Sequence, residues 1–283
     1  MRLAALVSGG KDSLYAAWLA KQAGHELVCL VGVISENPES YMFHTPNIAL
    51  VRKVAECMGV PLVSVRTKGE KEKELEDINV ALAALSRPIP QATAKPGAKP
   101  NAMCPRCGAK FVCNPGGDCW CKSEPYVLPV SGDRCLCPAC LRPRIEGIVC
   151  GAIASSYQKS RIERIARELG LALVAPLWGK RQEDVLRGEI NSGFKSIIVH
   201  VAAAGLDEKW LGRELDRIAL SDLLILQKRF GVSPVGEGGE FETLVLDCPL
   251  FGKRIKVLAS EKKWDTKTRS GTLEITEAEL IKK

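Results

Sequence analysis

The sequence predicts an α/β protein with a parallel sheet, and three observations support this prediction. Short apolar runs alternate with helix-length amphipathic segments before residue 87 and again after residue 144. A proline-rich stretch and eight closely spaced cysteines separate these two regions. After Trp178 the alternation gives way to a mixture of helices and short strands. We therefore expect three parts: residues 1–86 with 145–178, a linker and insert at 87–144, and a second, α+β domain at 179–283.

The elements of the first domain follow from their apolar patterns and from the residues that bound them. Continuous apolar runs predict buried strands at Leu3–Val7, Leu27–Ile34, Pro61–Val65, Gly147–Ile153 and Leu171–Ala175. Helices are expected at Ser13–Ala23, from Thr45 or Pro46 to the residue before Gly59, at Glu70–Leu85 and at Ser156–Leu169. This order places helices on both faces of a parallel sheet.

The second domain is expected to be mixed. We expect a helix at 181–191, a strand at Ser196–Val201, helices around 207–217 and 219–230, and short strands near 243–247, 253–258 and 272–275.

Composition excludes several classes of protein. Hydrophobic residues make up 46% and charged residues 26% of the 283 residues, as in ordinary folded domains. The sequence has no apolar run of about 18 residues, which argues against a transmembrane helix and a membrane partner. The apolar stretch at the N-terminus is too short for a signal peptide, so we expect a cytoplasmic protein. The net charge of +7 permits an RNA partner without requiring one.

The motif with the clearest chemistry joins the first strand to the first helix. It reads Ser8, Gly9, Gly10, Lys11, Asp12, Ser13. Its glycines allow a tight turn close to an anion, and the helix amides and serine hydroxyls can hold phosphate. The spacing fits neither a P-loop nor a Rossmann glycine fingerprint. The string resembles the pyrophosphate loop of the ATP pyrophosphatases, enzymes that split ATP between its α and β phosphates.

The loops that follow the predicted strands of the first domain are polar. They span 8–13, 35–45, 67–72, 154–159 and 176–179. Ligands of parallel sheets bind beyond the carboxyl ends of the strands, so we expect one shared site at this edge.

A glycine-rich acidic segment, 236–243, is the most unusual stretch of the second domain. It holds Glu237, Glu240 and Glu242 within six residues. In an extended chain Glu240 and Glu242 share a face, and Phe241 points the other way. Such carboxylates suit a cation, a metal or a proton to be removed, although a solvated turn would have the same composition.

Together these segments resemble the archaeal diphthine–ammonia ligase family, a branch of the pyrophosphate-loop ATP pyrophosphatases. The resemblance covers 1–86 and 145–283, and seven strings carry it: 8–13, 35–45, 69–74, 151–163, 177–179, 205–213 and 236–243. It implies a Rossmann-like fold of the adenine-nucleotide alpha-hydrolase type, with the second domain binding the substrate. It also implies ATP-dependent amidation of diphthine, a modified histidine of translation elongation factor 2. The diphthine carboxylate would form an acyl-adenylate and release pyrophosphate, and ammonia from ammonium would then displace AMP.

The resemblance assigns roles to individual residues. ATP would contact Ser8, Gly9, Gly10, Lys11, Asp12, Ser13, Gly151 and Ser155. Asp12 would contact Mg²⁺, Lys11 would offset phosphate charge, and one of the three glutamates Glu237, Glu240 and Glu242 would deprotonate ammonium. The substrate would contact Glu36, Asn37, Tyr41, His44, Tyr157, Gln158, Arg161, Trp178, Trp210 and Phe241, because its quaternary ammonium favours carboxylates and aromatic faces. His25 and His200 are interpreted as structural.

The cysteines of the insert predict a metal centre. They are Cys104, Cys107, Cys113, Cys119, Cys121, Cys135, Cys137 and Cys140. Eight thiolates match two structural Zn²⁺ ions with four cysteines each, and the segment resembles a small domain named for its Cys-Trp-Cys core. Disulfides and an iron–sulfur cluster are the alternatives. The insert joins a helix to the next strand, so it leaves from the edge opposite the nucleotide loops, and we expect a structural or partner-binding role.

Two other functions fit parts of the sequence. One is a tRNA-modifying, thiolation-type enzyme of the same superfamily, which would also combine a pyrophosphate loop with cysteine pairs. The other is a nucleotide-sensing zinc protein without catalytic activity that binds the ribosome or a translation factor. Stimulation of AMP formation by RNA, by the elongation factor or by neither distinguishes the three.

Overall fold

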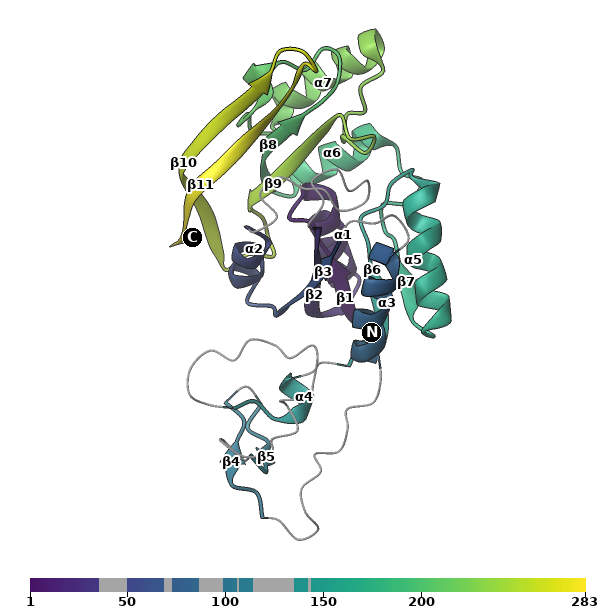
Figure 1. The fold of residues 1–283 in the computed structure, drawn as a ribbon, viewed down its shortest axis with the longest axis vertical. Helices are drawn as coiled ribbons and strands as arrows, with labels where there is room; N and C mark the ends of the chain where they lie inside the picture. Colours follow the sequence, from purple (N-terminus) through teal and green to yellow (C-terminus); the bar gives the residue numbers. More distant parts are fainter. Residues whose placement is uncertain (36–49, 69–72, 87–98, 106, 114–134, 142–143) are drawn as a thin grey trace.

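The structure is a computed structural model, and it describes all residues except 36–49, 69–72, 87–98, 106, 114–134 and 142–143. Two larger sheets organise it: a five-stranded parallel sheet in the order β3-β2-β1-β6-β7 and a four-stranded antiparallel sheet in the order β10-β11-β8-β9. The cysteine-rich insert lies on the far side of the parallel sheet from the antiparallel one (Figure 1). The predicted α/β fold with a second α+β domain is confirmed.

The parallel sheet has a helical layer on each face, because successive residues of its strands point to opposite sides. Its strands are β1 Arg2–Leu6, β2 Glu26–Ser35, β3 Leu62–Thr67, β6 Gly147–Val149 and β7 Ala172–Val174. Its helices are α1 Lys11–Gln22, α2 Val51–Met58, α3 Lys73–Ser86 and α5 Ser156–Glu168. Within β1, Ala4 packs with α3 and α5, whereas Leu3 and Ala5 pack with α1 and with the core of the second domain.

The second domain begins with α6 Gln182–Asn191 and continues through β8 Lys195–Val201, the short 3₁₀ helix η3 Glu208–Trp210 and α7 Arg217–Phe230. It ends with β9 Phe241–Asp247 and the hairpin β10 Lys253–Asp265 and β11 Ser270–Lys282. Its core is continuous with the α1 side of the parallel sheet. The pyrophosphate-type loop therefore lies against the second domain.

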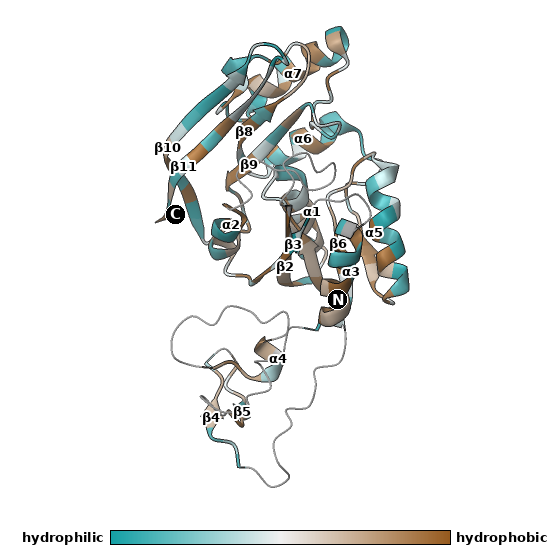
Figure 2. Ribbon diagram, in the orientation of Figure 1, coloured by the Kyte–Doolittle hydropathy of each residue, from teal (hydrophilic) through white to brown (hydrophobic). Residues whose placement is uncertain are grey.

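Two expectations for the second domain are wrong. The helix expected around 207–217 is a three-residue 3₁₀ turn, because Gly212 adopts a φ of 82° and Glu214 forms a bridge with Ile197. The last two strands are 13 residues each instead of about five. Much of β10 is hydrophilic (Figure 2). Cross-strand pairs such as Lys256–Glu279 accompany the strand pairing, so apolar alternation did not reveal its length.

In the first domain β6 is shorter than the expected strand, Gly147–Ile153. It ends at Val149 because the following residues leave the sheet to contact α1 and the second domain. The first turns expected for the helices that became α2 and α3 include 45–49 and 70–72, which lie outside the described residues.

The insert contains β4 Ala102–Met103, β5 Lys110–Phe111 and α4 Pro138–Leu141. Its two attachment points are neighbours, because the Ile145 amide donates to the Leu85 carbonyl at 3.1 Å. The insert thus joins the end of α3 to the start of β6, at the amino edge of the parallel sheet (Figure 1).

Candidate active site

A pocket of about 520 Å³ lies between the parallel sheet and the second domain. One wall comes from the ends of β1 and β2, the loop after β1, the loop after β6 and the start of α5. The other wall comes from residues 235–239, the first residues of β9, and His200 of β8. The first and fourth polar loops therefore meet here, as expected of the carboxyl edge of a parallel sheet.

The loop Ser8–Ser13 forms the floor of this pocket, and Ser8, Gly10, Asp12 and Ser13 line it. Gly9 makes the turn at a φ of 88°, a conformation that favours glycine. The N-terminal amides of the 12-residue helix α1 follow directly, and this is the arrangement that binds anionic groups.

Strand β9 clamps the loop from the second domain. The Val245 amide donates to the Gly9 carbonyl at 3.1 Å, and the Lys11 amide donates to Thr243 Oγ1 at 3.1 Å. Strand β9, at the edge of the antiparallel sheet, thereby fixes the loop Ser8–Ser13 of the parallel sheet.

The side chain of Lys11 differs from its expected role at a phosphate. It is 1% exposed and does not line the pocket. Its ammonium lies 2.6 Å from Asp12 Oδ1, 3.0 Å from the Val235 carbonyl and 3.6 Å from Glu189 Oε2. Burial lowers the pKa of Lys11, but the two carboxylates more than offset this and raise it above its ordinary value. Lys11 therefore joins the loop to the second domain as a buried cation.

Glu237 is held by the start of α5. Its Oε1 accepts hydrogen bonds from the amides of Ile153, Ala154 and Ser155 at 2.9, 2.8 and 3.0 Å. Negative charge at a helix N-terminus is stabilised in this way. The carboxylate of Glu237 is consequently a bridge between the two walls.

Glu240 is also occupied by backbone donors. Its two oxygens accept from the amides of Ser233 and Gly238 at 3.0 and 2.8 Å, which fixes the glycine-rich turn.

Glu242 is different from both. It lines the pocket, and its Oε2 is buried without a hydrogen-bond partner in the described part of the chain. Burial raises the pKa of this carboxyl from 4.5 to about 8. A carboxyl group whose pKa is raised towards neutral pH is a candidate for proton exchange with a bound molecule.

The remaining expected residues fall into several groups. Gly151, Ser155, Gln158 and Phe241 line the pocket. Tyr157 and Arg161 stack on each other with the guanidinium carbon 3.5 Å from the ring centroid, and Trp178 lies under Lys159 Nζ at 4.9 Å. None of these three lines the pocket formed by the described residues. Glu36, Asn37, Tyr41 and His44 lie outside those residues.

Trp210 is 7% exposed and belongs to the core of the second domain. Its ring is covered by Arg213, whose guanidinium carbon lies 4.2 Å from the centroid. The structure thus places Trp210 in the packing behind the site instead of on the pocket wall.

Three residues of the site region were not predicted from the sequence. His200, interpreted as structural, lines the pocket, Thr243 binds the loop, and Glu189 is buried beside Lys11. A histidine within an apolar strand signals nothing by itself, and its position here depends on the pairing of β8 with β9. Glu189 could have been found from the sequence as the one acidic residue on the face of α6 that is buried with Val185 and Leu186.

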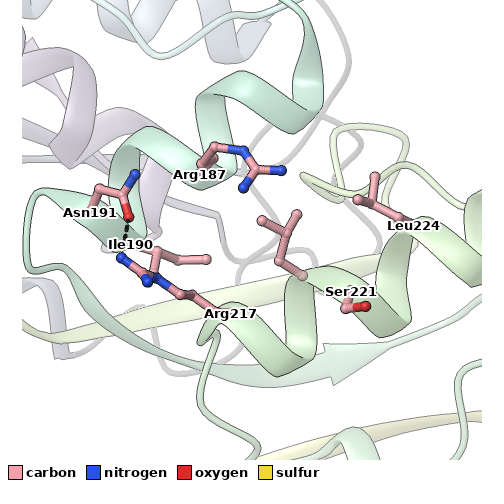
Figure 3. Close-up of a pocket in the computed structure, with 7 residues that line it drawn as sticks. Arg187, Ile190, Asn191, Arg217, Ser221 and Leu224 are labelled. Carbon is pink, nitrogen blue, oxygen red and sulfur yellow. Dashed lines mark hydrogen bonds between the residues drawn. The ribbon is translucent and has the colours of Figure 1, made fainter.

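A second hollow, of about 450 Å³, lies between α6 and α7 (Figure 3). Arg187 and Arg217 line it, and Arg217 Nη2 donates to Asn191 Oδ1 at 3.2 Å. None of the residues expected to act on ATP or substrate lies in it.

The insert holds a four-cysteine cluster of Cys104, Cys107, Cys137 and Cys140, whose sulfur atoms all lie within 4.8 Å of one another. The sulfurs of Cys107 and Cys137 are 3.6 Å apart. Four thiolates at about 2.3 Å from one Zn²⁺ would be about 3.8 Å from each other, so the cluster fits a tetrahedral metal ion.

The other four cysteines of the insert are not part of this cluster. Cys113 and Cys135 pack against it but are not among the four sulfurs that lie within 4.8 Å of one another, and Cys119 and Cys121 are outside the described residues. Within the described ranges, none of the ten cysteines forms a disulfide. A second metal ion stays a prediction.

Among the helices of the described residues, none has the length and apolar character needed to cross a bilayer.

The fold and the pocket define a class: a two-domain α/β protein in which a pyrophosphate-type loop meets an acidic strand of a second sheet. Residues 1–92 and 136–173 match the family model of the diphthamide synthase N-terminal domain, and residues 181–281 match that of the C-terminal domain. The chain belongs to the diphthamide synthase family.

Curated relatives support this assignment. The diphthine–ammonia ligase of Bos taurus is 33% identical over 280 residues, and that of Homo sapiens is 35% identical over 269 residues. Each alignment covers 92% of this chain and 84% of the relative. A tRNA-specific 2-thiouridylase of Helicobacter pylori is 42% identical, over 62 residues, which is 22% of this chain and 17% of that protein.

Among the solved structures that match is one described as a predicted subunit of tRNA methyltransferase from Methanocaldococcus jannaschii. It has a TM-score of 0.39 and 14% identity, with 88% of this chain and 98% of that chain covered, values too low to add to the assignment.

Proposed function

We propose that this protein is a diphthine–ammonia ligase that uses ATP to convert the carboxylate of diphthine on translation elongation factor 2 into an amide. One observation carries the proposal: the loop Ser8–Ser13 and the acidic strand β9 face the same pocket in a chain of the diphthamide synthase family. The first supplies a phosphate site and the second supplies carboxylates for proton transfer.

ATP would bind with its phosphates on the loop. Ser8, Gly10 and Ser13 offer hydroxyl and amide donors, and Gly151 allows the loop after β6 to lie against this loop and enclose the nucleotide. Mg²⁺ would neutralise the pyrophosphate as it leaves, and Asp12, which lines the pocket, has the oxygen ligands that this ion prefers.

The substrate carboxylate would attack the α-phosphate and form an acyl-adenylate with release of pyrophosphate. This activates a poor acylating group by attaching a good leaving group. Ammonia would then attack the carbonyl carbon, and AMP would depart with the electron pair of the broken bond. Glu242, which lines the pocket, would be the proton acceptor of the second step.

The insert would bind one structural Zn²⁺ through Cys104, Cys107, Cys137 and Cys140. Thiolate ligands in a small segment with little core explain how the insert folds. Its attachment at the amino edge keeps this ion away from the nucleotide loop.

The test is AMP release from ATP in the presence of Mg²⁺, ammonium and elongation factor 2 carrying diphthine. We expect release with this factor together with the mass change from acid to amide on the modified histidine. Unmodified factor and bulk tRNA are the controls. AMP release in the absence of a diphthine-bearing factor would overturn the proposal. So would a lack of AMP release when that factor is present.

The thiolation alternative has one observation in its favour, the 62-residue match to a tRNA 2-thiouridylase. That match covers 22% of the chain, whereas the ligase relatives cover 92%. The tRNA control decides between them, because AMP release with tRNA alone would move the protein to RNA modification. ATP binding without AMP release under any condition would instead favour the non-catalytic sensor.

A further inference from the structure

Amide formation from ammonium has a proton balance that the site must satisfy. Attack on an acyl-adenylate forms the C–N bond and breaks the bond from the carbonyl carbon to the AMP oxygen, and AMP leaves with that electron pair. The nitrogen enters as NH₄⁺ and ends as NH₂, so two protons leave it. One must go before the attack, since NH₄⁺ has no lone pair, and the other must go from the nitrogen after the C–N bond forms. The reaction therefore needs two proton acceptors near the same carbon.

A row of three side chains crosses the second sheet at the pocket. Thr272 of β11 is the register partner of His200 of β8, and His200 is the register partner of Glu242 of β9. Direct partners in antiparallel strands lie on one face with Cβ atoms about 4.5–5.5 Å apart. The imidazole and the carboxylate are thus neighbours, and both line the pocket.

The two neighbours have the chemistry that the proton balance requires. Glu242 Oε2 is buried without a hydrogen-bond partner in the described residues, whereas Glu237 and Glu240 are held by backbone amides. His200 Nδ1 lies 2.9 Å from Thr272 Oγ1, which fixes the ring and directs Nε2 away from Thr272. In the neutral tautomer that donates from Nδ1 to Thr272 Oγ1, Nε2 is the nitrogen that accepts a proton.

We infer that Glu242, in its ionised form, takes the first proton from ammonium, that His200 takes the second, and that Thr272 is a positioning residue for the imidazole. This inference rests on the proposed function and adds His200 to its machinery. The two groups hold both protons until they exchange with water after AMP leaves.

The test compares two nucleophiles. Hydroxylamine is neutral at pH 7 and loses one proton on acylation, whereas ammonium loses two. In Glu242→Gln we expect amide formation from ammonium to fall about 100-fold, while hydroxamate formation stays near that of the unchanged protein. In His200→Asn, which keeps a polar group near Thr272, we expect both products to fall, because both reactions release the second proton.

Exchange of pyrophosphate into ATP, dependent on the diphthine-bearing factor and measured without ammonium, reports on folding and adenylation. Both variants should retain it, as should the matched controls Glu279→Gln and His25→Asn, which should also make amide normally. An equal loss of both products in Glu242→Gln, or normal amide formation in His200→Asn, would overturn the inference. If the unchanged protein did not exchange pyrophosphate into ATP, the proposed function itself would be contradicted.

Discussion

The three glutamates of the segment 236–243 show how surroundings decide the role of a side chain. Glu237 completes the start of α5, Glu240 closes a glycine-rich turn, and Glu242 is buried with an oxygen that no described donor reaches. The sequence predicted that these carboxylates belong to the site, but it could not rank them. Their ranking depends on amides at Ile153–Ser155, about 80 residues away in the chain.

Glu242 should make stability depend on pH. Its pKa is about 8 in the folded protein and ordinarily 4.5, since burial disfavours the charge, in a pocket shared with Asp12, Glu237 and His200. The folded state therefore keeps a proton that the unfolded chain releases between these values. The stabilising contribution is fully present below pH 4.5 and is lost as the pH rises through about 8.

The measurement is thermal unfolding of Glu242→Gln and of the unchanged protein at about pH 5 and about pH 9. We expect the variant to lose less stability over this range, because glutamine does not titrate. An equal loss in both proteins would show that Glu242 has no raised pKa.

Glu237 should contribute to stability through its bonds to the backbone. Hydrogen bonds to a charged acceptor are worth about 1.5–3 kcal/mol, and Glu237→Gln keeps the shape while removing the charge at the helix start. We expect this variant to lower the free energy of unfolding by about 1–2 kcal/mol, as measured by urea titration. Glu277→Gln, on the exposed part of β11, is the control and should change little.

At the scale of elements, the site depends on close approach between segments that are distant in the chain. The loop after β6 passes directly over the first turn of α1: a Cβ on Gly151 would lie 2.6 Å from the Ser13 amide nitrogen. That amide belongs to the loop Ser8–Ser13, which is expected to hold phosphate. The contact explains both the early end of β6 and the need for glycine at this position.

Gly151→Ala should therefore displace the start of α1. We expect ATP binding to weaken by at least about tenfold. We also expect the free energy of unfolding to fall by about 1–3 kcal/mol, which is the range for overpacked cores. Gly252→Ala is a matched control, since a Cβ there would meet its nearest atom at an ordinary 3.6 Å. Calorimetric titration with ATP measures the first effect. Equal affinity in the two variants would contradict this account of the loop.

Elements were predictable from the sequence where burial dictates an apolar pattern. The strands β1, β2 and β3 and the helices α1 and α5 lie within two residues of their expected limits. The two strands of the hairpin β10–β11 were expected, but their length was not predictable, because much of the hairpin surface faces solvent and carries charges such as Lys263 and Glu274 in an ion pair. Strand pairing that relies on cross-strand contacts has no local sequence signal.

At the scale of the whole molecule, the metal cluster and the pocket belong to different parts of the chain. The cluster has four cysteines, so Cys137→Ser should remove one metal ion per chain, and Cys113→Ser should leave that ion in place. Elemental analysis of the purified proteins measures both. The loss of this ion from Cys113→Ser would show that Cys113 is one of its ligands.

The attachment of the insert leads to a prediction about the body. Because the Ile145 amide lies 3.1 Å from the Leu85 carbonyl, residues 87–144 leave and return at neighbouring points, and a short glycine–serine link can replace them. The remaining chain retains both sheets and all residues that line the pocket. Distant, independent sites change each other's energies by only about 0.3–0.5 kcal/mol, so we expect the ATP affinity of the deletion variant to stay within about twofold.

Calorimetric titration with ATP tests this expectation, and Gly151→Ala is the control in which ATP binding should be weakened.

The deletion variant also separates the two roles open to the insert. If the insert docks the elongation factor, amidation at low factor concentration falls and recovers at high concentration, whereas a structural insert leaves the KM for the factor unchanged. A deletion variant that folds but no longer binds ATP would contradict the topology itself, because it would couple the amino edge of the sheet to a site built at its carboxyl edge.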